Sequence, residues 1–546
     1  MRRLVASSAL LIILGSVSHL LAQSSSGTSS TAPSTDPTPS QTAAPAEQST
    51  DPATAQTAAP AAQSPDQNAP PSDANAPTGT AGAQPAAPQQ PTPRPAAQTP
   101  GVRAGSVNIT DKVTMGGYGS VRYETNSLKE PNKPAGFDFR RFVLATDATP
   151  NDRLQAYIEL EFERLGEIEI EKGLARTPTG TEFTEDLEGG NQGEISLEQM
   201  WGQFKFGTPL SVRFGQVLVP LGRFNINHDD DKWDIPRRTL VDRNVPILPV
   251  KAAWTELGFG GIGSVNVGKS GQLSYQGYVV NGATLDFSTE KAVASEANQP
   301  GVIRLASEFS LQRGPVNGQG GVRAAGWRVM YSPNLNYEIA LSNYEGGYTP
   351  DFFEPSDAHL SAWGVDGLFK HQTFALEGEW IHTHFGDLNG VEQAFVNAVT
   401  GSTGIAPLAG ADGTEAEFAL TNLSPNRYGF WLEGRYSFWP MKWTKNTLAK
   451  GFEDPQLTAV LRFERATVKD LIDQISIENG EISTDEPQTL RQQRFTIGLA
   501  YRPITSVVFS VAMEHNWRLE GPVLLFPFGQ PAQAYTSLLA GLAFGF

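Results

Sequence analysis

The chain has 546 residues, a formal net charge of −17 and no cysteine. The lack of cysteine excludes disulfides, thiolate chemistry and a lipid anchor attached through a cysteine. The acidic balance argues against nucleic-acid binding, because a phosphate backbone repels a negatively charged protein.

Residues 1–22 are predicted to be a secretory signal peptide. Arg2 and Arg3 precede an apolar run from Leu10 to Val17, and Ala22 offers a small residue for cleavage. The apolar run is shorter than the roughly 18 residues that a membrane-spanning helix needs. We therefore expect the chain to be exported.

Residues 23–106 are predicted to be a disordered linker rich in Pro, Ala, Ser, Thr and Gln. Between Gln23 and Gly101 there is no Val, Ile, Leu, Met, Phe, Tyr or Trp, and a tandem repeat begins at Ser34 and again at Ser49. A segment without large apolar side chains cannot offset its conformational entropy by burial. It is either a spacer in the periplasm or a segment that contacts peptidoglycan.

Residues 107–546 have a different composition and are predicted to form strands. Polar and apolar residues alternate with a period of two. One segment places Leu154, Ala156, Ile158, Leu160 and Phe162 on one face and Gln155, Tyr157, Glu159, Glu161 and Glu163 on the other. Sixteen such segments begin near residues 112, 137, 154, 195, 210, 253, 271, 322, 337, 359, 374, 427, 455, 489, 506 and 534. Residues 301–333 hold either one strand or a hairpin.

The period alone leaves two architectures open. In a soluble sandwich the apolar faces form the core, whereas in a membrane barrel they face lipid and the charged faces line the lumen. The final segment, AYTSLLAGLAFGF, has an apolar face that ends at Phe546, which is typical of the closing strand of an outer-membrane barrel. Together with the signal peptide, it predicts an all-β fold, a 16-stranded antiparallel transmembrane β-barrel preceded by a disordered tail.

Short and long connections alternate along this region. Thr208-Pro209 is a short connection, whereas 173–193 and 386–426 are long, and 441–454 is longer than its place in the alternation predicts. This asymmetry is typical of barrels with short periplasmic turns and long extracellular loops. We expect an aqueous channel in the bacterial outer membrane, in contact with outer-membrane lipid, with the N-terminal tail in the periplasm.

Two motifs resemble a known family, the phosphate-selective porins (porin O and P). Gly215 to Gly222, with the sequence GQVLVPLG, resembles the Gly-Gln-aliphatic-x-x-Pro strand of that family, and Phe139-Arg140-Arg141 is similar to its Arg-Arg strand. The resemblance implies a 16-stranded homotrimeric outer-membrane channel that is narrowed by its third extracellular loop.

The third long connection, 225–252, is therefore the candidate pore constriction. Its charged candidates are Asp229, Asp230, Asp231, Lys232, Arg237, Arg238 and Arg243. Basic side chains at a constriction replace the hydration of a passing anion. The same charges could instead form salt bridges that pack the loop against the wall, and the sequence leaves both interpretations open.

The polar faces of the strands predict a lumen of mixed charge. The candidate lumen-lining residues are Arg122, Glu159, Glu161, Glu163, Arg213, Glu377, Glu379, Glu433, Arg435, Arg462 and Arg494. A lumen of this kind carries a transverse field and does not strongly select one sign of ion.

The predicted function is that of an outer-membrane porin for passive diffusion of small hydrophilic solutes, with anions such as phosphate as one option. Two alternatives are a structural barrel tethered to the cell wall by its tail and a channel for sugars or cations. We expect no enzyme activity, catalytic residue, metal or cofactor. His382 and His384 share one strand face, but they continue an apolar face and are interpreted as interfacial residues.

Removal of residues 24–100 should leave barrel folding and conductance unchanged, because this segment has no apolar side chains with which to pack. The measurement is the heat-modifiable mobility and the single-channel conductance of the truncated protein beside the full chain. A truncated protein that does not fold would assign the segment a structural role.

Overall fold

A computed structural model describes most of the chain that follows the linker. The described residues are 106–128, 135–164, 167–177, 180–190, 194–242, 247–290, 302–315, 323–350, 358–394, 415–440, 448–452, 454–478, 481–484, 486–520 and 534–546. The signal peptide and nearly all of the linker lie outside them.

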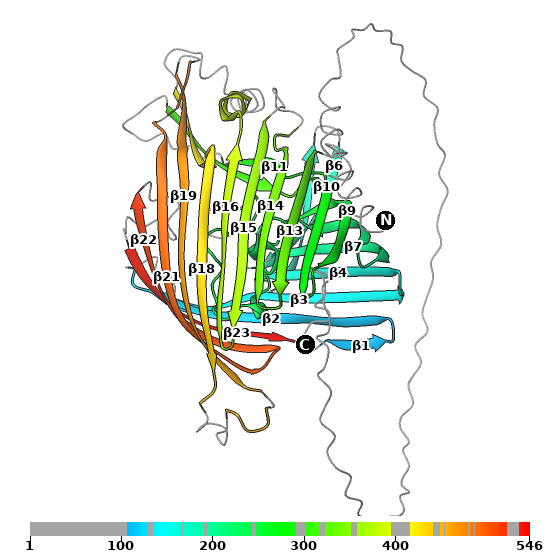
Figure 1. The fold of residues 1–546 in the computed structure, drawn as a ribbon. Coiled ribbons are helices and arrows are strands. Elements are labelled where there is room, and N and C mark those ends of the chain that lie inside the picture. Colours follow the sequence, from blue (N-terminus) through cyan, green and yellow to red (C-terminus); the bar gives the residue numbers. More distant parts are fainter. Residues whose placement is uncertain are drawn as a thin grey trace, which may run out of the picture. The chain divides into compact units, whose positions relative to one another are not determined.

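Sixteen antiparallel strands form a closed β-barrel, as the sequence predicts (Figure 1). In chain order they are β2 (Val113–Asn126), β3 (Ala135–Asn151), β4 (Leu154–Glu163), β7 (Glu194–Gly207), β8 (Leu210–Leu218), β9 (Thr255–Val267), β10 (Gly271–Val280), β13 (Ala324–Asn334), β14 (Tyr337–Gly347), β15 (His359–His371), β16 (Phe374–Phe385), β18 (Asn426–Phe438), β19 (Gln456–Glu478), β21 (Gln488–Ile504), β22 (Val507–Glu520) and β23 (Ala534–Gly545). Their first residues agree with the expected positions to within two residues.

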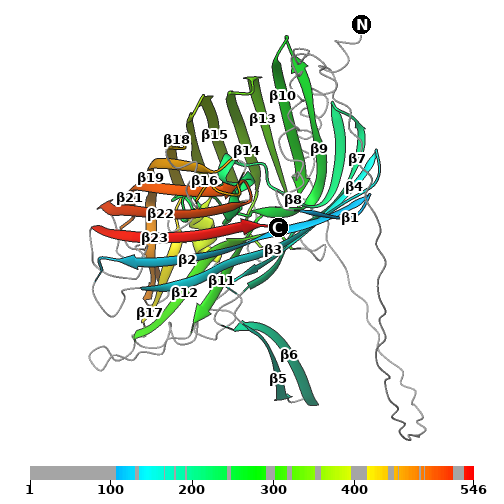
Figure 2. The same cartoon turned by 90° about the horizontal axis from the view of Figure 1, so that it is seen from below.

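The first and last barrel strands pair directly and close the ring (Figure 2). Tyr118 of β2 stands opposite Gly545 of β23, and the antiparallel register continues from there to Asn126 opposite Ser537. The expectation that the last strand closes against the first is therefore confirmed.

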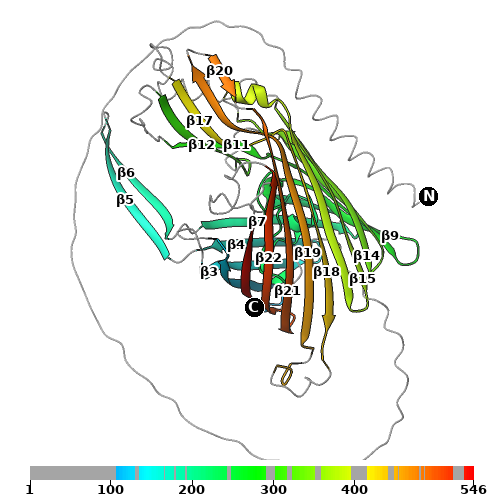
Figure 3. The same ribbon diagram turned by 90° about the vertical axis from the view of Figure 1, so that its left-hand side faces the viewer.

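Further strands lie in the long connections and before β2. The hairpin of β5 (Glu167–Thr177) and β6 (Gly180–Gly190) follows β4, and β1 (Val107–Thr110) pairs with β2. A second sheet joins β11 (Thr284–Glu290), β12 (Val302–Gln312), β17 (Glu415–Leu423), the end of β19 and β20 (Glu481–Thr484) (Figure 3). Segment 301–333 thus holds β12 of this second sheet and β13 of the barrel.

Connections at the opposite end are short. Two residues, 152–153, join β3 to β4, and two residues, 208–209, join β7 to β8. The connection 439–455 between β18 and β19 is the longer exception that the sequence indicates, and part of it lies outside the described residues. Within the part of the chain that the structure describes, no helix is both long and apolar enough to cross a membrane.

Burial on the barrel is the reverse of that in a soluble sandwich. On the outer face Phe214 is 67% exposed and Leu461 is 52% exposed. The charged residues that alternate with them point inward, and Glu433 and Arg494 are buried. Because the apolar face is the exposed one, the barrel alternative is correct.

Phe546 completes the seam between β2 and β23. Its backbone N–H donates to the Gly117 carbonyl at 3.0 Å, and the Gly117 N–H donates to the Phe546 carbonyl at 2.9 Å. Its ring stacks on Phe142 of β3, with ring centroids 5.7 Å apart. The last residue therefore links three consecutive strands of the closed ring.

Deletion of Phe546 should lower the fraction of folded, heat-modifiable barrel, because it removes both backbone bonds and the stacked ring. Phe546→Ala keeps the backbone bonds and should cost only about 1 kcal/mol, the usual contribution of an aromatic pair. Phe214→Ala, on the exposed face of β8, is the matched control. Normal assembly of the deletion variant would contradict this role of the terminal residue.

Candidate functional site: a loop folded into the barrel

The connection between β8 and β9, residues 219–254, folds into the barrel interior. It contains the short helix α2 (Arg223–Ile226) and a 3-10 turn η1 (Asp230–Lys232). The Ser120 hydroxyl of β2 donates to the Asp230 carboxylate at 2.7 Å, and the Leu240 N–H donates to Glu464 of β19 at 3.0 Å. These strands lie on different parts of the ring, so the loop crosses the lumen.

The wall makes room for the loop with inward-facing glycines. A Cβ atom at Gly498 of β21 would lie 2.6 Å from the Ile235 side chain, and one at Gly541 of β23 would lie 2.6 Å from Pro236. At Gly429 of β18 a Cβ would lie 3.1 Å from both Val241 and Ile247. We name these three glycines, Gly429, Gly498 and Gly541, the glycine seats. They let the loop approach the strand backbone closely.

Aromatic rings anchor the middle of the loop. Trp233 packs against Phe224 of the same loop at 5.1 Å and meets the edge of Trp431 of β18 at 5.6 Å. The guanidinium of Arg462, from β19, lies 5.2 Å from the Trp233 ring centroid. A cation over an aromatic face is a favourable contact when both groups are removed from water.

Arg237 is held by carboxylates from both sides of the seam. It forms ion pairs with Glu124 of β2 and, at 2.5 Å, with Glu514 of β22. Its carbonyl accepts a hydrogen bond from Arg462 at 3.1 Å. The loop is thus bonded here through both its side chain and its backbone.

Arg238 makes bonds mostly within the loop. Its guanidinium donates to the Ala252 carbonyl at 2.6 Å and lies 3.4 Å from the Asp242 carboxylate. Its own carbonyl accepts from Arg494 of β21 at 2.5 Å. Arg238 therefore joins the two ends of the loop while its backbone is attached to the wall.

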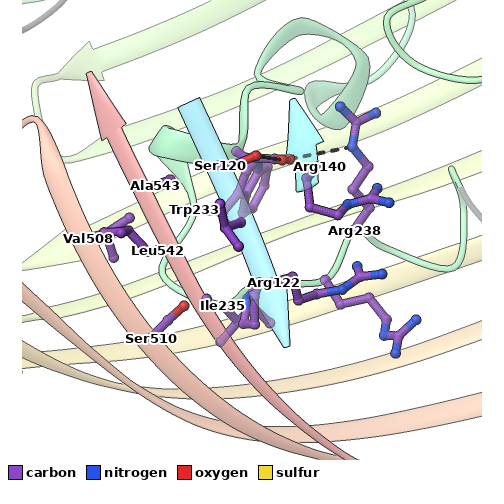
Figure 4. Close-up of a pocket in the computed structure, with 15 residues that line it drawn as sticks. Ser120, Arg122, Arg140, Trp233, Ile235, Arg238, Val508, Ser510, Leu542 and Ala543 are labelled. Atoms are coloured by element: carbon purple, nitrogen blue, oxygen red, sulfur yellow. Dashed lines mark hydrogen bonds and ion pairs between the residues drawn. The ribbon is translucent and has the colours of Figure 1, made fainter. Parts of the chain in front are cut away.

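Four arginines converge between the loop and the wall (Figure 4). Arg122, Arg140, Arg237 and Arg238 line a cavity of about 30 Å³. In Figure 4 the labelled side chains of Arg122, Arg140 and Arg238 extend to the same side of this cavity. A cavity of this volume has room for only a few water molecules.

A β-bulge places Arg140 in this cluster. The register between β2 and β3 shifts where Ser120 faces Arg141 and Val121 faces Phe139, which leaves Arg140 as the extra residue. A bulge inserts one unpaired residue and re-aims the neighbouring side chains. Arg140 and Arg141 are consequently both buried, although strict alternation would point one of them outward.

Asp230 balances part of this positive charge. Burial disfavours its charged form, but the Arg141 and Arg238 guanidinium groups outweigh burial and hold the pKa of Asp230 below its usual value. Asp230 is therefore a carboxylate at neutral pH. The arginine cluster carries a built-in counter-charge, which reduces the field that a passing anion meets.

On the opposite wall, Arg223 ties the beginning of the loop to three strands. Its guanidinium pairs with Glu377 of β16, with Glu338 of β14 at 2.9 Å and with Asp366 of β15 at 3.8 Å. Glu379 of β16 accepts the backbone N–H of Phe224 at 2.7 Å. These carboxylates anchor the loop and are not bare lumen charges.

Other predicted lumen residues are also paired. Glu161 and Glu163 contact Arg141 at 2.8 and 3.2 Å, Glu433 contacts Arg462 at 2.5 Å and also Arg435, and Glu464 contacts Arg494 at 2.5 Å. Glu159 accepts from Gln199 at 2.6 Å, and Arg213 donates to Gln203 at 2.8 Å. All of these side chains point into the barrel, but paired neighbours cover them.

The remaining loop candidates also make contacts either within the loop or with the wall. Asp229 pairs with Lys232 at 2.6 Å, and the Asp231 carbonyl accepts from Arg502 of β21 at 3.0 Å. Arg243 lies outside the described residues. Arg237 and Asp230 thus bond to the wall, whereas Asp229, Lys232 and Arg238 form their ion pairs within the loop.

Several residues that hold the loop were not among the sequence-based candidates. Arg223 and His228 match no sequence motif. The glycine seats fall at inward positions of their strands, and small residues at polar positions of a strand were the available signal. Arg140 was part of the family motif, but only the bulge turns it inward.

The two histidines of β16 lie on the outer face. The His384 Nδ1 atom lies 3.0 Å from the Asn426 side-chain oxygen, and His382 packs beside Trp380. Among the described residues no group of three His, Asp or Glu side chains is placed to hold a metal ion.

No protein-family model matches the chain. It is 26% identical over 183 residues to an uncharacterized protein of Aquifex aeolicus (strain VF5), a match that covers 33% of this chain and 35% of that protein. The chain therefore matches about a third of the length of that relative.

Similar solved structures are outer-membrane channels. An anion-selective porin from Comamonas acidovorans has 12% sequence identity and a TM-score of 0.41, covering 80% of this chain and 99% of that one. OmpF of Salmonella typhi in complex with daunomycin has 10% identity and a TM-score of 0.42, covering 81% and 100%. The channel DcaP of Acinetobacter baumannii has 11% identity and a TM-score of 0.38, covering 80% and 97%.

Gly498→Val should lower barrel stability by about 1–3 kcal/mol, because the new side chain overlaps Ile235 and forces the loop away from the wall. Gly202→Val is the control, since a Cβ at Gly202 of β7 meets no atom within 4 Å. The measurement is the urea midpoint of folded barrel. Equal midpoints for the two variants would show that the loop does not press on β21.

Proposed function

We propose that the protein is an outer-membrane porin through which small hydrophilic solutes diffuse passively. The observation that carries this proposal is a closed 16-stranded barrel whose exposed face is apolar and whose interior is charged. An apolar band of this kind is stable in hydrocarbon, because ring closure leaves no unpaired strand edge. The lumen of a barrel of this size is wide enough for an aqueous path unless a loop narrows it.

The proposed constriction is the loop 219–254 with its arginine cluster. Arg122, Arg140, Arg237 and Arg238 line one cavity between the loop and the wall, and guanidinium groups replace the hydration shell of an oxyanion well. Together with the family resemblance, this supports small anions, phosphate among them, as the favoured solutes. The carboxylates beside the cluster favour cations, so selectivity depends on the balance of the two.

A second candidate, the tethered structural barrel, is favoured by the pairing of the interior charges. The charged side chains around the loop are paired with one another or with the wall, so few of them are available to a passing solute. A planar-bilayer recording separates the two candidates. Steady single-channel currents support the porin, and their complete absence from correctly folded protein supports the structural barrel.

The cellular arrangement follows the same proposal. It comprises a cleaved signal peptide of residues 1–22, a periplasmic linker of residues 23–106 and a barrel of residues 107–546. A homotrimer is implied by the family resemblance, and the linker is a candidate for peptidoglycan contact. Mass measurement of the purified protein, chemical cross-linking and a peptidoglycan pull-down with and without residues 24–100 test these points.

Replacing both Arg237 and Arg238 with Ala should shift selectivity toward cations. The change removes Arg237 from Glu124 and Glu514 and removes Arg238 from Asp230, so the constriction loses two positive charges and becomes more negative. The measurement is the reversal potential across a planar bilayer under a salt gradient. The control is a double Ala variant of Arg153 and Lys269, which are exposed in turns at the opposite end of the strands. Charges on an outer loop are screened beyond about 10 Å at moderate salt. An unchanged reversal potential would therefore show that this loop does not form the constriction.

A further inference from the structure

A buried histidine sits where the loop begins to cross the lumen. His228 follows α2 and is only 2% exposed. Its Nδ1 atom lies 2.8 Å from the Asn225 carbonyl, which can only accept a hydrogen bond. Its Nε2 atom lies 3.2 Å from a carboxylate oxygen of Glu198, which is fully buried on β7. The Nδ1 atom therefore faces a hydrogen-bond acceptor, and Nε2 faces a carboxylate that an imidazolium can pair with by charge.

Charged groups from each neighbouring element surround this ring. Within the loop, the Asp229 carboxylate lies 3.7 Å from Nε2, and Arg238 donates to the His228 carbonyl at 3.0 Å. From the wall, the Glu198 side chain of β7 is hydrogen-bonded to the Glu161 side chain of β4. Glu161 in turn forms an ion pair with Arg141 of β3. Asp229 is in turn paired with Lys232.

The balance of these groups favours the charged ring. Burial lowers the pKa of His228, but the Glu198 and Asp229 carboxylates outweigh burial and raise it above the usual histidine value. A raised pKa means that the stabilising contact is fully present below the ordinary histidine pKa. The contact is then lost as pH rises through the higher value.

We propose that His228 is a pH-sensitive latch that fastens the constriction loop to β7. In its protonated state the ring joins the Asn225 carbonyl at the end of α2 to Glu198 on the wall. Loss of the proton leaves Glu198 buried without its histidine partner and frees the loop from β7 at the point where it leaves α2. The ion pairs of Arg223 still hold the first residues of the loop to the opposite wall. The consequence for permeation rests on the proposed porin function, because the latch would regulate the same constriction.

The latch can be tested without any current measurement, because the chain contains no cysteine. Val241→Cys places a single thiol at a fully buried position of the loop, where a maleimide reaches it only after the loop leaves the wall. Lys251→Cys, at an exposed position of the same loop, corrects for the general rise of thiol reactivity with pH. The rates are measured on the purified full-length barrel between pH 6 and pH 9.

The corrected rate at Val241→Cys should rise several-fold with pH when His228 is intact. Adding His228→Gln, which keeps a polar side chain but cannot carry the charge, should make the rate high and independent of pH. Glu198→Gln should have the same effect from the other side of the contact. A pH profile that stays the same in both backgrounds, or a thiol that never reacts, would overturn the latch.

Single-channel recordings of the same proteins separate this proposal from the porin proposal. The full chain should show conductance or current noise that changes with pH, and the His228→Gln variant should not. Protein that conducts at every pH with no difference between the two contradicts the latch alone. Protein that never conducts but shows the pH-dependent thiol reaction contradicts the porin alone.

Discussion

Closure of the strand ring is the constraint on which the rest of the structure depends. Each unpaired backbone group costs several kcal/mol in an apolar surrounding, so an apolar outer face requires a sheet without edges. The pairing of β2 with β23 removes the last edge, and Phe546 extends that pairing to the end of the chain. Once the ring is closed, alternation along every strand sends apolar side chains outward and charged ones into a common interior. The interior must then satisfy many charges at close range.

The loop between β8 and β9 meets that requirement. It supplies Arg223 and Arg237 to carboxylates on different walls and presents its backbone to Arg462, Arg494 and Glu464. Ion pairs withdrawn from water contribute little net stability, because desolvation offsets most of the Coulomb energy. Breaking one pair is costly, however, since it leaves a buried charge without a partner. The network therefore holds the loop in one position more than it stabilises the barrel. The glycine seats also hold the loop in this position, because they let its side chains pack directly on the strand backbone.

Much of the fold could be predicted from the sequence, because strand alternation is a local property. Each strand repeats apolar and polar residues with a period of two, and the start of each of the sixteen was predicted to within two residues. The identity of the loop that enters the barrel was also predictable, from its place in the connection order and its density of charge. The partners of its charges were not. Arg237 meets Glu124 and Glu514, which lie more than a hundred and more than two hundred residues away, and no local pattern relates them.

The sequence by itself determined the strand pattern, the division of each strand into an apolar and a polar face, and the loop that is the candidate constriction. Local backbone geometry is sufficient for these, since side chains on a strand alternate whatever their partners are. Only the tertiary structure decided which faces were exposed, that a bulge turns Arg140 inward beside Arg141, and that His228 faces Glu198. It also decided that most of the predicted lumen charges are paired, mainly with neighbouring strands and in part with the loop. These features depend on how residues distant in sequence meet around a closed ring, and the geometry of the ring exists only after all its strands have paired.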